Sequence, residues 1–480
     1  MPVCDFIITG ARLIDGTGGS SSFQDIAVDR DRIVEIGDCR HWTADQTIDA
    51  NGLVLAPGFI DSHTHDDHAV LDSDSFICKL SQGVTSIVAG NCGIGIAPLN
   101  PNIELPAPFP ILADKDAFRY ASVSQYREEI TRSGTRLNLA FLTGHSNLRL
   151  NAMKSGWDRK STEEEQKAMA EQLRQSLQEG CIGLSSGLDY PPAEKSTTDE
   201  LMTIAKVLKD FDQAVYVTHM RSESDHIMEA IEETLQIGQS SRSSVIISHH
   251  KCAGPKNYGK SAMTLGRIDQ AIESGQNVSF DVYPYIASST SLLASYVDES
   301  ESILVVESEP FPEFNGQYLH QIAEAWKMDQ KECCERLYPA TAIYFSMHKS
   351  DLNRILSHPA GMIGSDGIAS MRKPHPRLWG TFPKVLGYYV REQRLMALET
   401  AVHKMTGLTA KNFGLKDRGI LKPGNFADLV LFDPETIIDR ASFDDPCQLC
   451  VGIKQVWING KSSWNKSKIE GSANGLFLHH

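Results

Sequence analysis

Hydrophobic and polar residues alternate in short runs at both ends of the chain, and Gly, Asp and Ser residues separate these runs. Alternation with a period of two is typical of β-strands that bury one face. We therefore predict one small β-sandwich domain assembled from both termini, over residues 1–55 and 416–480. Its predicted strands are 6–10, 11–15, 25–28, 32–36, 427–432 and 454–460.

The middle of the chain has a different pattern, in which short apolar runs alternate with segments of helical periodicity such as 162–179 and 226–238. This alternation favours parallel strands joined by crossover helices. We predict a (β/α)8 barrel over residues 56–415, an α/β fold whose reactive groups lie at the carboxyl ends of the strands. The eight predicted strands are 53–56, 85–89, 137–142, 181–185, 214–218, 244–248, 278–283 and 362–365.

One connection in the barrel is unusually long. The stretch between the seventh and eighth predicted strands, 286–361, exceeds an ordinary loop. We predict that residues 286–343 fold as an insertion over the barrel mouth and serve as a lid.

Composition narrows the class of protein. The 480 residues are 41% hydrophobic and carry a net charge of −15, which fits a large enzyme and argues against a nucleic-acid partner. The sequence starts without a signal-peptide pattern, and no apolar run approaches the roughly 18 residues of a membrane span, so we expect no membrane association. Ten scattered cysteines favour reduced thiols and a cytoplasmic location. The isolated Cys447/Cys450 pair predicts no zinc or redox site, and the terminal His479-His480 is set aside as a tag remnant.

Candidate metal ligands follow the predicted barrel strands. His63 and His65 are two residues apart, so on an extended backbone both imidazoles point the same way. A lone histidine or cysteine at a strand end is more often a packing residue, but convergence from five strands on one face favours a metal site. A thiolate with imidazoles suits Zn²⁺ better than Mg²⁺ or Ca²⁺. The other candidates are Cys92, His219, Asp366 and one of the adjacent His249 and His250, of which strand alternation lets only one face inward.

Several segments together make the chain resemble a known family. From residue 3 to about 465 it resembles the amidohydrolase superfamily, and within it the N-acyl-D-amino-acid deacylases (D-aminoacylases). The segments that carry the resemblance are HTHDD (63–67), GNCG (90–93), GHSNLR (144–149), YPP (190–192), THMR (218–221), SHHK (248–251), YPY (283–285), GSDG (364–367) and RKPHPRLWGTFPKVLG (372–387).

The resemblance implies a ligand set and a reaction. Cys92, His219 and His249 would form a tight zinc site, with His249 preferred over His250. A second, weaker site would use His63 and His65 with Asp366. Zinc would acidify the attacking water, and Asp366 would act as general base and then acid; the alternative for Asp366 is a ligand without a proton-transfer role. The product would be a carboxylate and a free D-amino acid.

The family pattern also suggests substrate contacts. Arg377, Lys251 and Tyr283 occupy positions that would bind the substrate α-carboxylate, because a buried carboxylate needs cationic or hydroxyl donors. Further candidates for substrate contacts are Ser289, Tyr190 and Arg221. For Arg221, a role as a surface cation without substrate contact is equally supported. His145 is left open between an acyl-group contact and a packing role.

The predicted lid suggests the side-chain preference. Acid-preferring members of the family carry an arginine just after the seventh strand, whereas residues 288–299 of this chain contain no Arg or Lys. We therefore predict a small-molecule substrate with a neutral, mainly hydrophobic D-side chain. The residues available for an apolar pocket are Leu292, Leu293, Tyr296, Tyr344 and Met347.

Two other functions remain open on the sequence alone. One is hydrolysis of a cyclic amide or D-peptide-like substrate, although the fourth strand ends in Gly183-Leu184-Ser185-Ser186-Gly187 and lacks the bridging lysine of hydantoinases. The other is a non-catalytic structural homologue, which usually loses its metal ligands. The oligomeric state is open between a monomer and a small homo-oligomer.

Overall fold

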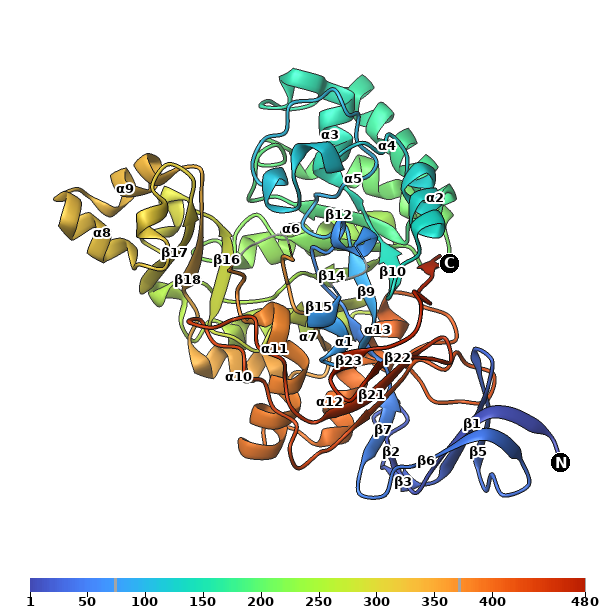
Figure 1. Ribbon diagram of the computed structural model, residues 1–480. Helices are drawn as coiled ribbons and strands as arrows, with labels where there is room; N and C mark the ends of the chain where they lie inside the picture. The colour runs from blue at the N-terminus through green and yellow to red at the C-terminus, as the bar shows by residue number, and fades with distance from the viewer. Residues whose placement is uncertain (73–75, 370–372, 480) are drawn as a thin grey trace.

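The computed structural model describes residues 1–72, 76–369 and 373–479. Figure 1 shows a central barrel, a β-rich part built from both ends of the chain, and a lobe that projects from the barrel mouth. The predicted fold class, a (β/α)8 barrel with a small β domain, is confirmed. The domain limits given above remain a prediction.

The barrel consists of parallel strands, each paired with the next along the chain. It closes where the amide of Ser62 donates to the carbonyl of Ile363 at 3.4 Å and Thr64 forms a bridge with Gly367. Apolar side chains such as Val88, Val217 and Met362 fill its interior. The strands are β8 (Phe59–Asp61), β9 (Val84–Ala89), β10 (Asn138–Phe141) continuing as β11 (Thr143–Gly144), β12 (Gly183–Gly187), β13 (Val215–His219), β14 (Ser244–Ile247), β15 (Val278–Val282) and β19 (Gly361–Ile363).

Helices surround the barrel. The predicted helix 162–179 is found as α4 (Glu163–Gln178), and Thr162 caps it in a reciprocal capping box with Glu165. The segment 226–238 is found as α6 (Ile227–Ser241). The other helices around the barrel are α1 (Ile77–Leu80), α2 (Val123–Ser133), α3 (His145–Met153), α5 (Thr198–Ala205), α7 (Ser261–Glu273), α10 (Lys349–Ser357), α11 (Arg377–Lys384), α12 (Leu398–Met405) and α13 (Gly407–Asn412).

The first predicted barrel strand, 53–56, is wrong. Strand β7 (Val54–Pro57) pairs with β20 (Leu429–Phe432) and β2 (Arg12–Leu13) in the β domain, and the barrel begins at β8. Both segments are short and fully buried, and Gly58 separates them. A buried apolar run therefore identified a strand but not the sheet to which it belongs.

Both termini contribute to the β domain, as predicted from the alternating pattern. Strand β20 from the C-terminal part lies between β7 and β21. Phe6 stacks on Trp457 at 5.6 Å within the apolar cluster of this domain. The remaining strands are β1 (Val3–Thr9), β3 (Ser22–Phe23), β4 (Asp25–Asp29), β5 (Arg32–Gly37), β6 (Thr43–Asp49), β21 (Ile453–Ile458), β22 (Lys461–Asn465) and β23 (Lys468–Ile469).

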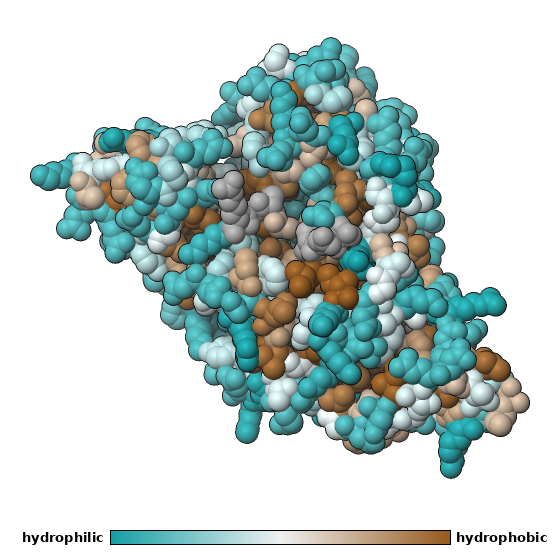
Figure 2. Space-filling view, viewed as in Figure 1, coloured by the Kyte–Doolittle hydropathy of each residue, from teal (hydrophilic) through white to brown (hydrophobic). Residues whose placement is uncertain are grey.

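The insertion after β15 folds as its own small unit, which we call the lid (residues 286–345). Its three antiparallel strands are β16 (Ala287–Ser291), β18 (Ala340–Phe345) and β17 (Ser302–Ser308), covered by α8 (Leu319–Trp326) and α9 (Gln330–Leu337). Figure 2 shows the lid as a lobe whose visible surface is mostly hydrophilic. Its apolar residues, including Leu292, pack inside this unit.

The last described residues form a strand that the sequence pattern missed. Strand β24 (Phe477–Leu478) pairs in parallel with β10, and the amide of Leu139 donates to the carbonyl of Leu476 at 2.8 Å. Phe477 lies 6.4 Å from Tyr126 in an edge-to-face contact. Residues next to the terminal histidines are thus part of the packed structure.

Within the described ranges, no helix is both long and apolar enough to cross a membrane.

One buried cation near the start of β19 predicts a pH-dependent stability. Lys404 is 1% exposed, and its Nζ donates to the carbonyls of His358 and Gly361 rather than to a carboxylate. Burial lowers the pKa of Lys404 to about 7, against roughly 10.4 in an unfolded chain. Between these values the unfolded chain binds the extra proton, so the folded state gains stability as pH rises. Lys404→Met should remove this gain. The free energy of unfolding of the wild type, relative to that of Lys404→Met, should therefore increase by about 2–3 kcal/mol from pH 7 to pH 9.

Urea denaturation of both proteins at the two pH values measures this difference. The exposed Lys115 provides a control, because Lys115→Met should show no such pH-dependent difference. If the difference in free energy of unfolding between the wild type and Lys404→Met stays constant with pH, the lowered pKa of Lys404 is contradicted.

Candidate metal centre

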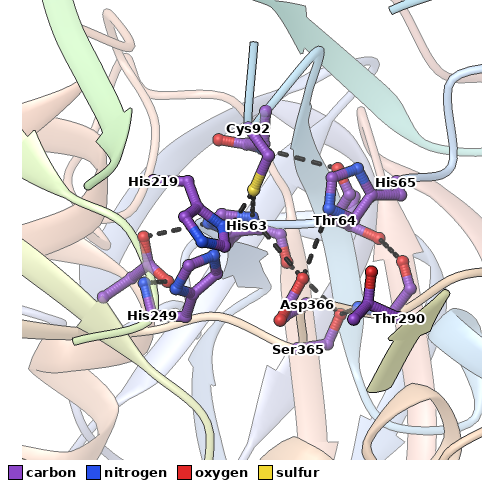
Figure 3. A network of polar contacts seen from close by, with 12 residues as sticks. His63, Thr64, His65, Cys92, His219, His249, Thr290, Ser365 and Asp366 are labelled. Carbon is purple, nitrogen blue, oxygen red and sulfur yellow. Dashed lines mark hydrogen bonds and ion pairs between the residues drawn. The ribbon is translucent and has the colours of Figure 1, made fainter. Parts of the chain in front are cut away.

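Six side chains meet at the carboxyl end of the barrel (Figure 3). His63 and His65 follow β8, Cys92 follows β9, and His219 ends β13. His249 follows β14, and Asp366 follows β19. All are at most 7% exposed. Within three overlapping groups every ligand atom lies within 4.8 Å of the others; the groups are His63/His65/Cys92, Cys92/His219/His249 and His63/His249/Asp366.

Cys92 lies at the centre of this cluster. Its Sγ is 3.4 Å from Nε2 of His63 and 3.4 Å from Nε2 of His249. Burial opposes ionisation of the thiol, but the imidazoles of His63 and His249 hold the pKa of Cys92 well below its usual value. A thiolate shared between two imidazole groups is the donor set that Zn²⁺ prefers. The residues present therefore fit one or two zinc ions.

Asp366 lies on the pocket side of the cluster. Its Oδ1 is 3.3 Å from Nε2 of His65 and 3.6 Å from Nε2 of His63, and its Oδ2 is 2.8 Å from Arg377. Burial would raise the pKa of Asp366, but Arg377 and the imidazole of His249 hold it well below its usual value. The carboxylate is therefore ionised at neutral pH and can accept a proton.

The neighbouring histidine is not part of the cluster. The Nε2 of His250 contacts Thr264 Oγ1 at 2.9 Å, and burial lowers the pKa of His250 to about 3. Of the adjacent pair, His249 faces the cluster and His250 packs against α7.

Three of these residues hold an unusual backbone. Cys92, His249 and Asp366 have φ angles of 53°, 35° and 48°, in the left-handed region that favours glycine. Such conformations cost on the order of 1–3 kcal/mol each and persist where the surroundings determine them. The amide of Asp366 donates to the carbonyl of His63 at 2.7 Å, which ties this strained turn to the metal cluster.

Sequence reasoning missed two carboxylates that contact the histidines. Asp281 accepts from Nδ1 of His63 at 3.2 Å, and Glu223 lies 2.8 Å from Nδ1 of His249. Asp281 is a charged residue in an otherwise mostly apolar buried strand, which could have marked it. Glu223 follows His219 by four residues in a loop, and the sequence offers no signal for it.

A third missed group is a buried lysine behind the cluster. Lys79 is fully buried, and its Nζ lies 2.6 Å from Asp61, 3.1 Å from Asp66 and 2.8 Å from the hydroxyl of Ser365. Burial disfavours the charge, but Asp61 and Asp66 raise the pKa of Lys79 above its ordinary value. Because Ser365 precedes Asp366, Lys79 links the loop after β8 to the loop after β19.

Above the cluster lies a pocket of about 360 Å³ between the barrel loops and the lid. The barrel contributes Tyr190, Arg221 and Lys251 to its lining, and the lid contributes Ser289 and Tyr344. The cluster residues Cys92, His219, His249, His65 and Asp366 also line it. Any molecule in this pocket would therefore lie next to the metal ligands.

Arg377, Tyr283 and Ser289, all predicted to bind a carboxylate, lie close together, and of these three only Ser289 lines the pocket. The Arg377 guanidinium lies 4.7 Å from the ring centre of Tyr283, and its Nη2 donates to the carbonyl of Ser289 at 3.2 Å. The buried hydroxyls of Tyr283 and Ser289 have no hydrogen-bond partner within the described residues. Lys251 donates to both carboxylate oxygens of Glu223 at 2.6 Å.

Other predicted substrate residues are already engaged. Arg221 lines the pocket, but its guanidinium lies 3.0 Å from Glu233 and donates to the carbonyl of Ser196. The hydroxyl of Tyr344 donates to Ser291 and accepts from the amide of Leu293. Tyr190 donates to Thr290 at 3.3 Å and packs edge-on against His219.

One expectation needs correction: Met347 does not line the pocket but packs with Tyr283 and Tyr285. His145 contacts Glu200 at 2.9 Å, and Arg149 lies 2.5 Å from the same carboxylate. Of the two roles left open for His145, the structure shows packing in a buried ion network.

We predict that the Lys79 network stabilises the fold. Lys79→Met would leave the carboxylates of Asp61 and Asp66 buried without their cation, at a cost of roughly 3–5 kcal/mol. The free energy of unfolding in urea measures this cost. Adding Asp61→Asn to Lys79→Met should restore part of the loss, because it removes one unpaired charge; a cost below about 1 kcal/mol for Lys79→Met would contradict the prediction.

Comparison with known proteins identifies the family to which the chain belongs. The model of the amidohydrolase family matches residues 46–285 and 335–463. The chain is 44% identical over 474 residues to the N-acyl-D-aspartate deacylase of Alcaligenes xylosoxydans xylosoxydans, covering 99% of this chain and 95% of the relative.

Two solved structures are also closely similar. A D-aminoacylase superposes with a TM-score of 0.96 at 43% identity, covering 99% of this chain and all of the other. That D-aminoacylase has a binuclear metal centre, with one-metal activation and second-metal attenuation. The N-acyl-D-glutamate deacylase of Bordetella bronchiseptica, complexed with zinc and a phosphonate mimic of the tetrahedral intermediate, superposes with a TM-score of 0.95 at 41% identity, covering 99% and 100% of the chains. This chain is therefore a member of the amidohydrolase family, and within it of the N-acyl-D-amino-acid deacylases.

Proposed function

We propose that this protein hydrolyses the amide bond of N-acyl-D-amino acids with zinc, releasing a carboxylate and a D-amino acid with a neutral or hydrophobic side chain. The observation that carries the proposal is the buried Cys92–histidine–Asp366 cluster at the floor of a pocket, with Arg377 in contact with Asp366. The relatives are named for N-acyl-D-amino acids or D-amino acids, and two of the three are named for the acidic substrates N-acyl-D-aspartate and N-acyl-D-glutamate.

Two metal positions fit the cluster. Cys92, His219 and His249 would hold the tight zinc, and His63, His65 and Asp366 would define a weaker neighbouring site. When bound, zinc acidifies a water molecule and polarises the acyl carbonyl. The binuclear centre described for the D-aminoacylase structure supports a shared ligand, and Cys92 belongs to two of the three ligand groups.

Asp366 is suited to move the proton. It is ionised, buried and next to the cluster, so it can take a proton from the attacking water and return it to the leaving amine nitrogen. Arg377 keeps this carboxylate charged in its buried setting.

The substrate α-carboxylate would bind at the Arg377 corner. This corner holds Arg377 with Tyr283 and Ser289. The hydroxyls of Tyr283 and Ser289 have no hydrogen-bond partner within the described residues, so both are available to donate to a carboxylate. A buried carboxylate requires such donors. Lys251 would add positive charge, reduced by its contact with Glu223.

The pocket wall supports a neutral side chain. Among the described residues that line it, the only Arg and Lys residues are Arg221 and Lys251, and each already contacts a glutamate. An acidic side chain would find no free cation there. The apolar and aromatic part of the lining comprises Ile94, Pro108, Ile111, Ile368, Tyr190, Tyr296 and Tyr344, and the carboxylates Asp189, Asp225 and Glu299 also face the pocket.

The cyclic-amide alternative has less support. Strand β12 (Gly183–Gly187) contains no lysine that could bridge two metals. The cytoplasmic location also stays a proposal; it rests on the ten cysteines, all of which are free thiols.

We predict that N-acetyl-D-methionine is hydrolysed at least about tenfold more efficiently than N-acetyl-D-glutamate, because the second carboxylate would be buried without a cation. Steady-state kcat/KM for the two substrates measures the preference, with N-acetyl-L-methionine as the test of handedness. Faster turnover of the glutamate compound would overturn the proposed side-chain preference.

Metal and base can be separated by substitution. Cys92→Ala should lose both tightly bound zinc and activity, because it removes the ligand at the centre of the cluster. Asp366→Ala should retain zinc while kcat falls by about 10²–10⁴-fold, the range of a lost general base. Zinc content after dialysis and kcat are the measurements. Full zinc and turnover in Cys92→Ala would refute the assigned ligand set.

A further inference from the structure

We propose that Asp281 is a positioning residue that presents two histidines, His63 and His249, to the metal. It lies on β15 and is fully buried. One carboxylate oxygen contacts the ring of His63, and the other contacts the backbone of His249. A single side chain thus joins ligands that come from the first and sixth strands of the barrel.

The contact with His63 sets which ring nitrogen faces the metal. Oδ2 of Asp281 lies 3.2 Å from Nδ1 of His63, and a carboxylate can only accept, so Nδ1 carries the proton. In the neutral ring the lone pair is then on Nε2. That atom faces the cluster, at 3.4 Å from Cys92 Sγ and 3.6 Å from Asp366 Oδ1. Carboxylates that hold a ligating histidine in this way fix both its tautomer and its orientation.

The contact with His249 stabilises an unfavourable backbone. The amide of His249 donates to Oδ1 of Asp281 at 2.8 Å, and the amide of His250 donates to the main-chain carbonyl of Asp281 at 2.8 Å. His249 has a φ of 35°, a conformation that costs energy in any residue other than glycine. The charge-assisted hydrogen bond offsets this cost and turns the His249 ring toward Cys92, with His250 directed away.

Glu223 does not duplicate this role. It contacts the ring of His249 at Nδ1 and the ammonium of Lys251, and its side chain is 14% exposed at the pocket. Within the part of the chain that the structure describes, Glu223 contacts His219, His249 and Lys251 but not His63, which it would have to reach to join the two strands. Asp281 is therefore the group that couples His63 to His249 inside the barrel.

An amide cannot replace this carboxylate. Asparagine at 281 would offer one acceptor oxygen and one NH₂ donor. If its oxygen accepts from the His249 amide, its NH₂ faces Nδ1 of His63 and favours the tautomer with the proton on Nε2. In the opposite orientation two donors face each other at His249. Either arrangement loses one of the two contacts while volume stays the same.

The test compares zinc affinity in Asp281→Asn and in a matched control. The control is Asp351→Asn, because Asp351 is also a buried carboxylate that accepts from backbone amides, at 2.7 Å from Gly259, and it lies on α10 away from the cluster. Competition with a chromogenic chelator gives the zinc affinity of each folded full-length protein. Asp281→Asn should bind zinc about 10–100-fold more weakly than wild type, and the visible spectrum of its Co²⁺ form should change.

The control separates positioning from general stability. Asp351→Asn should melt at a lower temperature with unchanged zinc affinity and Co²⁺ spectrum. If Asp281→Asn binds zinc within twofold of wild type, the proposal is overturned whatever its melting temperature. The readout needs no substrate, so it stands apart from the proposed deacylase activity.

A measurement on the wild-type protein covers the case in which Asp281→Asn does not fold. ¹⁵N NMR of histidine-labelled protein, with the His63 signal assigned from His63→Gln, reports which ring nitrogen carries the proton. In the zinc-loaded protein, a proton on Nδ1 of His63 supports the contact with Asp281, and an unprotonated Nδ1 overturns it.

Discussion

The structure depends on one constraint: every charged group buried at the barrel mouth needs a partner of opposite charge or a strong donor. Transfer of an isolated ion into such a site costs many kcal/mol, so unpaired groups would neutralise or open the fold. The partners are found in pairs around the cluster. Arg377 faces Asp366, Lys79 faces Asp61, and Lys251 faces Glu223. The geometry of the metal ligands follows from these pairs as much as from the barrel itself.

The parallel barrel explains why the ligands could be predicted from the sequence. Polar residues that directly follow apolar strands converge at one end of a (β/α)8 barrel, so Cys92, His219 and Asp366 could be identified without coordinates. Spacing also resolved His63 and His65, since alternate residues of an extended chain face the same side. The pattern reports where a strand ends, and in this fold that is sufficient to bring distant residues together.

Features that depend on pairing between distant segments could not be predicted. The segments β7 and β8 are both short and fully buried, and only their partners, β20 and β9, decide which sheet each one joins. The two-residue strand β24 has no periodicity to detect. Asp281, Lys79 and Glu223 are ordinary residue types whose importance comes from what they contact. Met347 was misplaced for the same reason, because its position after β18 does not reveal which side of the pocket wall it occupies.

The shared use of Arg377 links binding to chemistry under the proposed function. Its guanidinium lies 2.8 Å from Asp366, and the same group is the strongest candidate partner for the substrate α-carboxylate. A bound carboxylate would compete for the positive charge that keeps Asp366 acidic. Asp366 would then become a better proton acceptor when substrate is present, because the favourable charge that lowers its pKa would be divided between two anions. Substrates without an α-carboxylate would leave Arg377 fully on Asp366, so under the proposed function N-acyl amino acids would be favoured over simple amides at the catalytic step as well as in binding.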